Sequence, residues 1–212
     1  FKNNKQNGQG TYTYADGSVY IGDFTNDVKT GLGTKTWGLK TALAGDKYVG
    51  AFKNNKQNGQ GTYTYADGSI YVGNFSNDVK TGQGTKTWGP KSALVGDRYV
   101  GAFKNNKQNG QGTYTYADGS IYVGNFSDNV MVGKGALTWG PETDLAGHKY
   151  IGDFKDNKQN GQGTYNYSDG STYVGGFQND MKTGHGVKAW PDGNEYTGAF
   201  KDNLRTGQGT YT

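Results

Sequence analysis

Hydrophobic and polar residues alternate along short runs of the chain, and residues 61–75 (GTYTYADGSIYVGNF) show the pattern well. β-Branched and aromatic residues dominate both runs, which flank an Asp-Gly pair. Such a pair between alternating runs is the strongest short-range signal for a β-hairpin. The sequence therefore predicts hairpin tips at Asp16-Gly17, Asp67-Gly68, Asp118-Gly119, Asp169-Gly170 and Asp192-Gly193. No segment carries a convincing helical period.

The alternation also indicates which side chains share a face of a strand. Tyr20 and Phe24 lie on one face and Ile21 on the other. A two-residue turn at the tip would place Tyr12 on the face of Ile21. A turn with one residue more or fewer would place Tyr12 on the opposite face. The pattern leaves this register open. We expect Gly22 to leave room for a ring from a neighbouring strand.

Nine phenylalanines mark an internal repeat, because a Gly follows each of them by seven residues and another by nine. They are Phe1, Phe24, Phe52, Phe75, Phe103, Phe126, Phe154, Phe177 and Phe200. Their spacing is 23 or 28 residues. Residues 1–212 are therefore predicted to be one continuous array of about nine units or part-units. The stretch KNNKQNG, with its copies, is expected to be a solvated return loop between hairpins.

Three units are longer by five residues, so the full period is 51 residues. Four tryptophans follow this period: Trp37, Trp88, Trp139 and Trp190. The longer units carry an extended tip with one leucine each, which is Leu43, Leu94 or Leu145. These leucines form a candidate docking row for a partner, since insertions in repeat proteins often lie on the binding face. Alternatively, each leucine covers its own tryptophan.

A single hairpin is not stable in water, so neighbouring hairpins must bury its aromatic side chains. The predicted fold is all-β: an elongated, twisted, single-layer antiparallel meander of stacked hairpins. We expect its core to be an aromatic ladder. The ladder residues are Tyr20, Phe24, Trp37, Tyr48, Phe52, Tyr71, Phe75, Trp88, Tyr99, Phe103, Tyr122, Phe126, Trp139, Tyr150, Phe154, Tyr173, Phe177, Trp190, Tyr196 and Phe200.

Composition supports an ordered chain with a thin core. Only 32% of the residues are hydrophobic, mean hydropathy is −0.88 and 38 residues are Gly, which alone would favour disorder. However, 17 Tyr, 9 Phe and 4 Trp are too many for a solvated coil. No apolar run approaches the ~20 residues of a membrane helix. The chain starts inside a repeat, so we expect a fragment, and any targeting signal would lie outside it. Cytoplasm or a membrane surface is the favoured location.

The sequence offers no arrangement for catalysis, a metal or a cofactor. His148 and His185 lie far apart in unlike contexts, and both are expected to face solvent. No helix follows any Gly-x-Gly, so these glycines do not form a phosphate cradle. We therefore predict a protein that is not an enzyme and binds no cofactor.

Lysines recur within the predicted return loops at 51-residue spacing and would line one edge. They are Lys2, Lys5, Lys53, Lys56, Lys104, Lys107, Lys155 and Lys158. Lys29, Lys80 and Lys182 are expected in the intervening loops. Such an edge would attract anionic lipid head groups, although lysines also keep loops soluble and discourage aggregation. The net charge of +4 does not demand a nucleic acid, and the rings are needed for stacking, so that partner is not favoured.

The stretches YVGNFSNDVKTGQGTKTW and YIGDFKDNKQNGQGTYNYSDGSTYVGGF resemble MORN (membrane occupation and recognition nexus) repeats. The resemblance covers essentially the whole chain, and it implies an elongated sheet of hairpins that scaffolds proteins or associates with membranes. The extended tips depart from the family pattern. The predicted function is a non-catalytic scaffold for an unidentified protein partner. The alternatives are a peripheral module that binds anionic phospholipids through the lysine edge, and a filament subunit that self-associates through open sheet ends.

Overall fold

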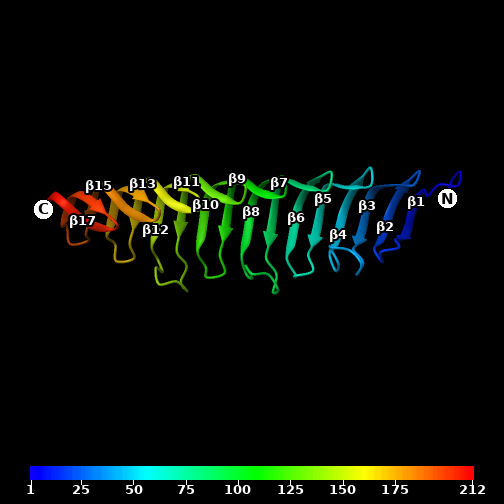
Figure 1. The fold of residues 1–212 in the computed structure, drawn as a ribbon, viewed down its shortest axis with the longest axis horizontal. Helices are drawn as coiled ribbons and strands as arrows, with labels where there is room; N and C mark the ends of the chain where they lie inside the picture. The colour runs from blue at the N-terminus through cyan, green and yellow to red at the C-terminus, as the bar shows by residue number, and fades with distance from the viewer. The chain divides into compact units, whose positions relative to one another are not determined.

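The computed structural model describes residues 1–212, which form two compact units, Phe1–Lys107 and Gln108–Thr212. It contains no helix and seventeen β-strands (Figure 1). The first unit holds β1 (Gly8–Thr13), β2 (Val19–Thr25), β3 (Val28–Thr36), β4 (Lys47–Lys53), β5 (Lys56–Thr64), β6 (Ile70–Ser76), β7 (Val79–Thr87) and β8 (Arg98–Lys104). The second holds β9 (Lys107–Thr115, which begins one residue earlier), β10 (Ile121–Ser127), β11 (Val130–Thr138), β12 (Lys149–Lys155), β13 (Lys158–Asn166), β14 (Thr172–Gln178), β15 (Met181–Ala189), β16 (Glu195–Lys201) and β17 (Leu204–Tyr211).

Within each unit every strand pairs antiparallel with the next strand along the chain. The pairs run from β1–β2 to β7–β8 in the first unit. They run from β9–β10 to β16–β17 in the second. Each unit is thus an open, single-layer meander, which confirms the predicted all-β fold class. One continuous array over residues 1–212 stays a prediction.

The tightest connections are two-residue turns at one edge of each sheet, here called the turn edge. Asn54 and Asn55 join β4 to β5, and both have positive φ, at 52° and 67°. This is the type I′ geometry that suits the twist of a hairpin, and Asn tolerates it. The prediction of a return loop at KNNKQNG was therefore wrong. Only two residues form the turn, Lys56 begins a strand, and Gln57 is buried.

Each turn is also joined to the hairpin before it. The Asn55 side chain accepts a hydrogen bond from the Lys29 backbone N–H at 2.8 Å, and the Asn55 N–H donates to the Lys29 carbonyl at 3.2 Å. Asp78 makes the same two bonds with Gln57 at 2.8 and 3.0 Å. Short polar residues are therefore required at these positions for their side-chain acceptors as well as for their backbone conformation.

The Asp-Gly tips lie at the opposite edge, here called the tip edge, and they settle the hairpin register. The Tyr14 N–H donates to the Ser18 carbonyl at 2.9 Å, which leaves a turn longer than two residues. As a result, Tyr12 pairs with Tyr20, and the two side chains share a face. Of the turn lengths that the sequence left open, the structure therefore has the turn that is longer than two residues.

One face of the sheet, here called the aromatic face, is covered by rings that contact each other edge to face. Tyr71 has no exposed surface, and its ring centroid lies 5.2 Å from that of Phe75 on the same strand. On the other side it lies 4.9 Å from Phe103. The same arrangement recurs from hairpin to hairpin, and edge-to-face pairs of this kind stabilise a core beyond their area alone. The core is thus a single layer of rings.

Each tyrosine of this layer lies flat over a pair of glycines. A Cβ built on Gly73 would be 2.5 Å from the Tyr71 hydroxyl, and one built on Gly84 would be 2.6 Å from the same ring. Gly73 and Gly84 are directly paired across β6 and β7. In the first repeat, Gly22 lies under Tyr20 of its own strand. The expectation that a ring from a neighbouring strand fills that space was therefore wrong for Gly22, although it describes Gly33, which also lies under Tyr20.

Candidate functional site

The other face of each sheet, here called the open face, leaves apolar side chains exposed to solvent. A row of β-branched residues crosses the strands of the first unit as direct cross-strand partners. These are Ile21, Thr34, Val49, Thr62, Val72 and Thr85. Val72 is 48% exposed, and Ile21 is 52% exposed. Thr34, Thr62 and Thr85 lie between these residues and are half-buried, so the row exposes apolar methyl groups on every second strand and is a candidate contact surface.

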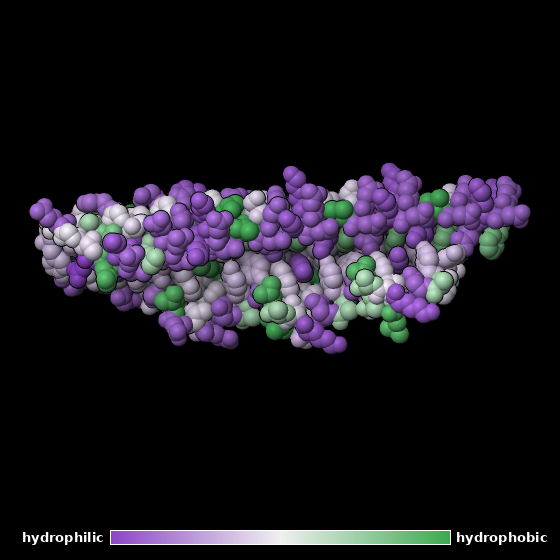
Figure 2. Space-filling model, in the orientation of Figure 1, coloured by the Kyte–Doolittle hydropathy of each residue, from purple (hydrophilic) through white to green (hydrophobic).

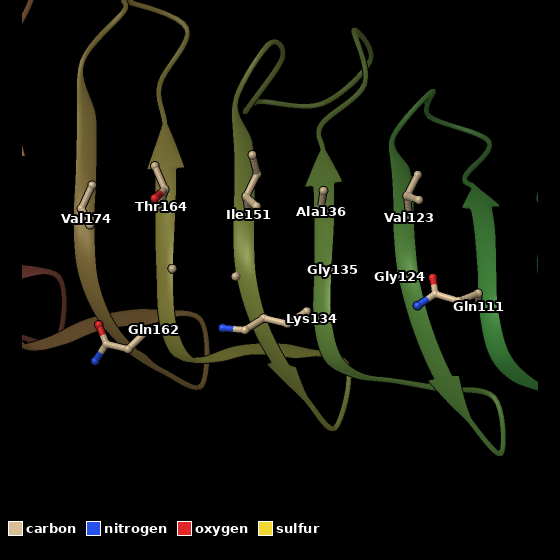
Figure 3. Close-up of a pocket in the computed structure, with 12 residues that line it drawn as sticks. Gln111, Val123, Gly124, Lys134, Gly135, Ala136, Ile151, Gln162, Thr164 and Val174 are labelled. Atoms are coloured by element: carbon tan, nitrogen blue, oxygen red, sulfur yellow. The ribbon is translucent and has the colours of Figure 1, made fainter.

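A groove runs beside this row, and the backbone of the glycine pairs forms its floor. In the second unit it has a volume of about 560 Å³ (Figure 3). Val123, Ile151 and Val174 lie along one wall, and Gln111 and Gln162 lie on the other side of the glycines. A groove of about 320 Å³ lies in the first unit, where Ile21 and Val49 line one side and Gln9 and Leu32 line the other.

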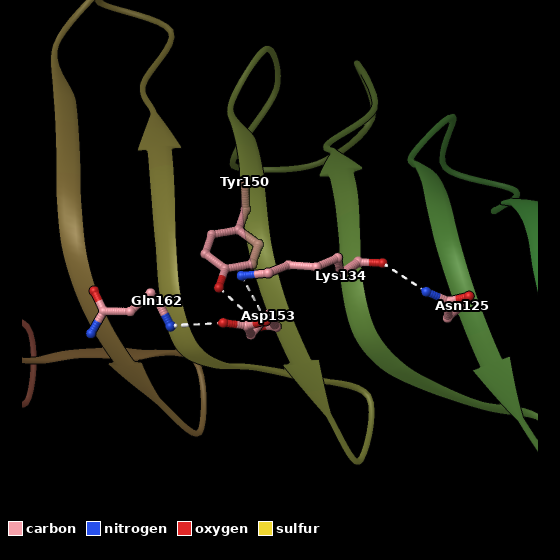
Figure 4. A network of polar contacts seen from close by, with 5 residues as sticks. All are labelled: Asn125, Lys134, Tyr150, Asp153 and Gln162. Atoms are coloured by element: carbon pink, nitrogen blue, oxygen red, sulfur yellow. Dashed lines mark hydrogen bonds and ion pairs between the residues drawn. The ribbon is translucent and has the colours of Figure 1, made fainter.

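The polar wall of the groove is held by side-chain hydrogen bonds. In the second unit the Lys134 ammonium group lies 2.9 Å from the Asp153 carboxylate, which also accepts from the Gln162 N–H at 3.1 Å (Figure 4). The hydrogen bond from Lys134 lowers the pKa of Asp153. The Tyr150 hydroxyl, from the aromatic face, donates to the Asp153 carbonyl at 2.9 Å. This wall is therefore mainly neutral or internally paired.

The groove offers methyl groups, backbone and amide groups, which suit binding more than bond-breaking chemistry. No group of three or more His, Cys, Asp or Glu side chains is placed to hold a metal ion. With no helix in the structure, no helical membrane span is present.

The lysines predicted to line an edge are exposed in all eight cases and lie at the turn edge, away from the groove. In the first unit the surface along this edge is largely hydrophilic (Figure 2). Lys53 and Lys56 flank one turn, but the adjacent turns carry Asp27 and Asp78 instead. The edge therefore alternates between basic and acidic turns.

The leucines of the extended tips lie outside the groove as well. Leu43, Leu94 and Leu145 are 45%, 48% and 39% exposed. Their loops belong to the tip edge, after β3, β7 and β11. A role for them in docking stays a prediction.

Lys29, Lys80 and Lys182 are not loop residues, which corrects the expectation from the sequence. Lys29 is only 8% exposed and lies in β3 opposite Phe24, on the aromatic face. Its ammonium group donates to the Tyr14 hydroxyl at 2.9 Å. Lys29 lies in a strand and not in a loop because the Asn-Asp turn uses only two residues, so β3 begins at Val28.

A second lysine lies six residues after each of these and approaches the same tyrosine ring. Lys86 lies 5.2 Å from the ring centroid of Tyr65, while Lys80 donates to the hydroxyl of that tyrosine at 2.5 Å. We call each such set a lysine pair. The pairs are Lys29 with Lys35, Lys80 with Lys86, and Lys182 with Lys188. The sequence signal that was missed is this six-residue spacing, which recurs with the 51-residue period in every copy except the third.

The lysine pairs predict an unusual dependence of stability on pH. Burial, followed by the charge of Lys86, lowers the pKa of Lys80 to about 8, whereas an unfolded lysine has a pKa of about 10.4. Between these values the unfolded chain binds more protons than the folded chain, so the free energy of unfolding rises with pH.

We expect a gain on the order of 1 kcal/mol between pH 7.5 and pH 9.5, measured by urea unfolding. Lys80→Met should lose this part of the gain, because methionine does not titrate. The fold should tolerate the change, since the equivalent position in the third copy holds Met131. Burial raises the pKa of Tyr71 to about 12, so ionisation of unfolded tyrosine opposes the gain above pH 10. If the free energy of unfolding changed equally with pH in Lys80→Met and in the unsubstituted protein, the low pKa assigned to Lys80 would be contradicted.

His148 was wrongly expected to face solvent. It is half-buried, and its Nδ1 lies 2.8 Å from the Tyr165 hydroxyl. In the first unit Asp46 occupies the equivalent position and accepts a hydrogen bond from the Tyr63 hydroxyl at 2.5 Å. His148 thus replaces a structural partner of a tyrosine. His185 is exposed, as expected.

Comparisons with solved structures find sheets of similar fold at low sequence identity. The G-box domain of the microcephaly protein CPAP, whose structural analysis suggests a role in centriole elongation, is 11% identical with a TM-score of 0.53. That match covers 97% of this chain and 98% of the other. The TCP domain of SAS-4 (dCPAP) from Drosophila melanogaster, solved with a proline-rich motif of Ana2, is 14% identical with a TM-score of 0.42. That match covers 72% of this chain and 83% of the other. At 11% identity the likeness to the CPAP domain concerns the fold alone.

A comparison with curated proteins finds no match. The family model of the MORN repeat, in contrast, matches nine segments along almost the whole chain. They are residues 1–19, 20–38, 48–70, 71–92, 99–121, 122–142, 150–172, 173–195 and 196–212. These segments follow the predicted units of 23 and 28 residues. The chain therefore belongs to the MORN repeat family.

Proposed function

We propose that this chain is a non-catalytic scaffold that binds a protein partner on its open face. The observation that carries the proposal is the difference between the two faces. The aromatic face is closed by its own rings, with Tyr20, Tyr48 and Tyr71 fully buried. The open face leaves Ile21, Val49 and Val72 about half exposed, and a groove lies beside Ile21 and Val49. MORN-family membership supports a role in interaction rather than catalysis.

The chemistry of the open face fits a partner with apolar side chains and backbone groups. Methyl groups of Val49 and Val72 offer apolar area, and side-chain amides of β5 and β6 can bond main-chain groups. Gln60 Nε2 is already held by Asn74 Oδ1 at 2.8 Å, so these amides are partly pre-organised.

Site-specific photocrosslinking in cells tests this proposal. A benzoylphenylalanine placed at Val72 should capture a discrete protein, whereas one placed at Lys53 on the turn edge should not. Adding Val49→Lys should reduce the crosslinked product at least tenfold, because a charge would enter the apolar row. Val49 is 44% exposed, so this change should leave the fold intact, as checked by circular dichroism.

A second candidate function is binding to anionic phospholipids through the turn edge. The exposed lysines of the first unit favour it, although Asp27 and Asp78 reduce the local charge. Co-sedimentation with phosphatidylserine vesicles that is lost in Lys53→Glu/Lys56→Glu, combined with no crosslink at Val72, would favour this candidate over the scaffold.

A further inference from the structure

Each lysine pair places two ammonium groups against one tyrosine. In the second copy, Lys80 bonds the Tyr65 hydroxyl, while Lys86 lies over the ring at 5.2 Å and 4.8 Å from the ring of Trp88. In the fourth copy, Lys182 bonds the Tyr167 hydroxyl at 2.5 Å. The tyrosine thus holds both cations in place.

These cations make no close ion pair in the protein, although the charges of Asp16, Asp67 and Asp169 act on Lys35, Lys86 and Lys188 from further away. No carboxylate lies within 4.0 Å of any of the six ammonium groups. Asp67 is the acidic group whose charge reaches Lys86, but its carboxylate accepts the Ser69 N–H at 2.7 Å. Lys80 and Lys86 are both desolvated, and each pair concentrates positive charge. Like charges in a partly buried place are costly unless an anion joins them.

The third copy shows that the fold does not need these charges. Met131 and Leu137 replace both lysines there, and the Tyr116 hydroxyl lies 3.8 Å from the Met131 sulfur. Met131 is 8% exposed, so the apolar pair packs well. Both lysines are absent together, as expected for two groups that act on one ligand. Packing alone would be served equally well by the apolar pair in every copy.

We propose that each lysine pair, together with its tyrosine hydroxyl, binds one oxyanion of the phosphate or sulfate type. Two ammonium groups beside one hydroxyl group offer several donors to a group with several acceptor oxygens. In the fourth copy the Lys188 ammonium also bonds the Ser171 hydroxyl at 2.6 Å, which adds a further polar group. Two such sites lie in residues 1–107 and one lies in residues 108–212. This inference stands apart from the proposed function, since it concerns the opposite face.

Calorimetric titration of the intact chain with inorganic phosphate tests the proposal, with chloride at equal ionic strength as the reference. We expect three phosphate sites in the natural protein. Lys80→Met/Lys86→Leu copies the pair that the third repeat already accommodates and should leave two sites. Met131→Lys/Leu137→Lys should raise the number to four. Lys53→Met/Lys56→Leu removes two exposed lysines from the turn edge and should leave three.

Nuclear magnetic resonance of the lysine side chains supplies a second readout. Phosphate should raise the pKa of Lys80 by about one unit or more, because a bound anion favours the charged amine. Water-soluble dihexanoyl phosphatidic acid identifies the source of the group. Equal affinity means that phosphate alone is recognised, and at least tenfold tighter binding assigns the sites to a lipid head group. The proposal would be overturned if phosphate released no more heat than chloride at equal ionic strength. It would also be overturned if the natural protein and the three double variants all had the same number of sites.

Discussion

Replacing Gly84 with Ala will destabilise the hairpin of β6 and β7 by about 3 kcal/mol, a large effect for one methyl group. The added Cβ would lie 2.6 Å from Cε2 of Tyr71, which is closer than carbon atoms can approach. The ring has no room to move, because Phe75 and Phe103 pack against it on both sides. Either the ring leaves its contacts or the strands separate.

Gly10→Ala is the matched control for this substitution. Gly10 occupies the same place in the Gly-x-Gly motif, but its nearest neighbour is the Phe24 ring at 3.4 Å, an ordinary contact. We expect a change within about 0.5 kcal/mol. Hydrogen exchange of the β6 and β7 amides should report the loss locally, since repeat arrays need not unfold in one step. Similar losses for the two variants would show that the ring over the glycine is unimportant.

The hairpins themselves were predictable because their signals are local. Alternation and Asp-Gly pairs indicated antiparallel strands, and the 51-residue period indicated stacking. The register was not predictable, since it depends on one residue in the tip. The Tyr14–Ser18 hydrogen bond decides it, and that bond places Tyr12 opposite Tyr20. A shift by one residue would have exchanged the two faces.

The candidate site was harder to predict than the fold. The sequence identified the exposed lysines of the edge, but the groove depends on which face the rings close. The lysine pairs were missed for a related reason. A register shift between Gly73 and Asn74 brings Phe75 opposite Lys80 on the aromatic face. Such a bulge has no clear signal in a polar stretch, so the lysines there resembled loop residues.

Phe75→Ala should have the other large effect, a loss of about 3–5 kcal/mol. Phe75 is 4% exposed, and its ring lies 5.0 Å from Tyr48 and 5.2 Å from Tyr71. It therefore joins the hairpin of Tyr48 to that of Tyr71. In a single-layer core no second sheet can close the space that its ring leaves, so the cavity should fill with water.

The effect should also extend beyond the mutated strand, since each hairpin is stabilised by its neighbours. We expect hydrogen exchange to accelerate in β4 to β7. Val72→Ala, on the same strand but on the open face and 48% exposed, should cost less than about 1 kcal/mol. If the two variants unfolded at the same urea concentration, the ring layer would not be the core. A large loss for Phe75 alone would mean that the aromatic face maintains the fold, which leaves the open face free for a partner.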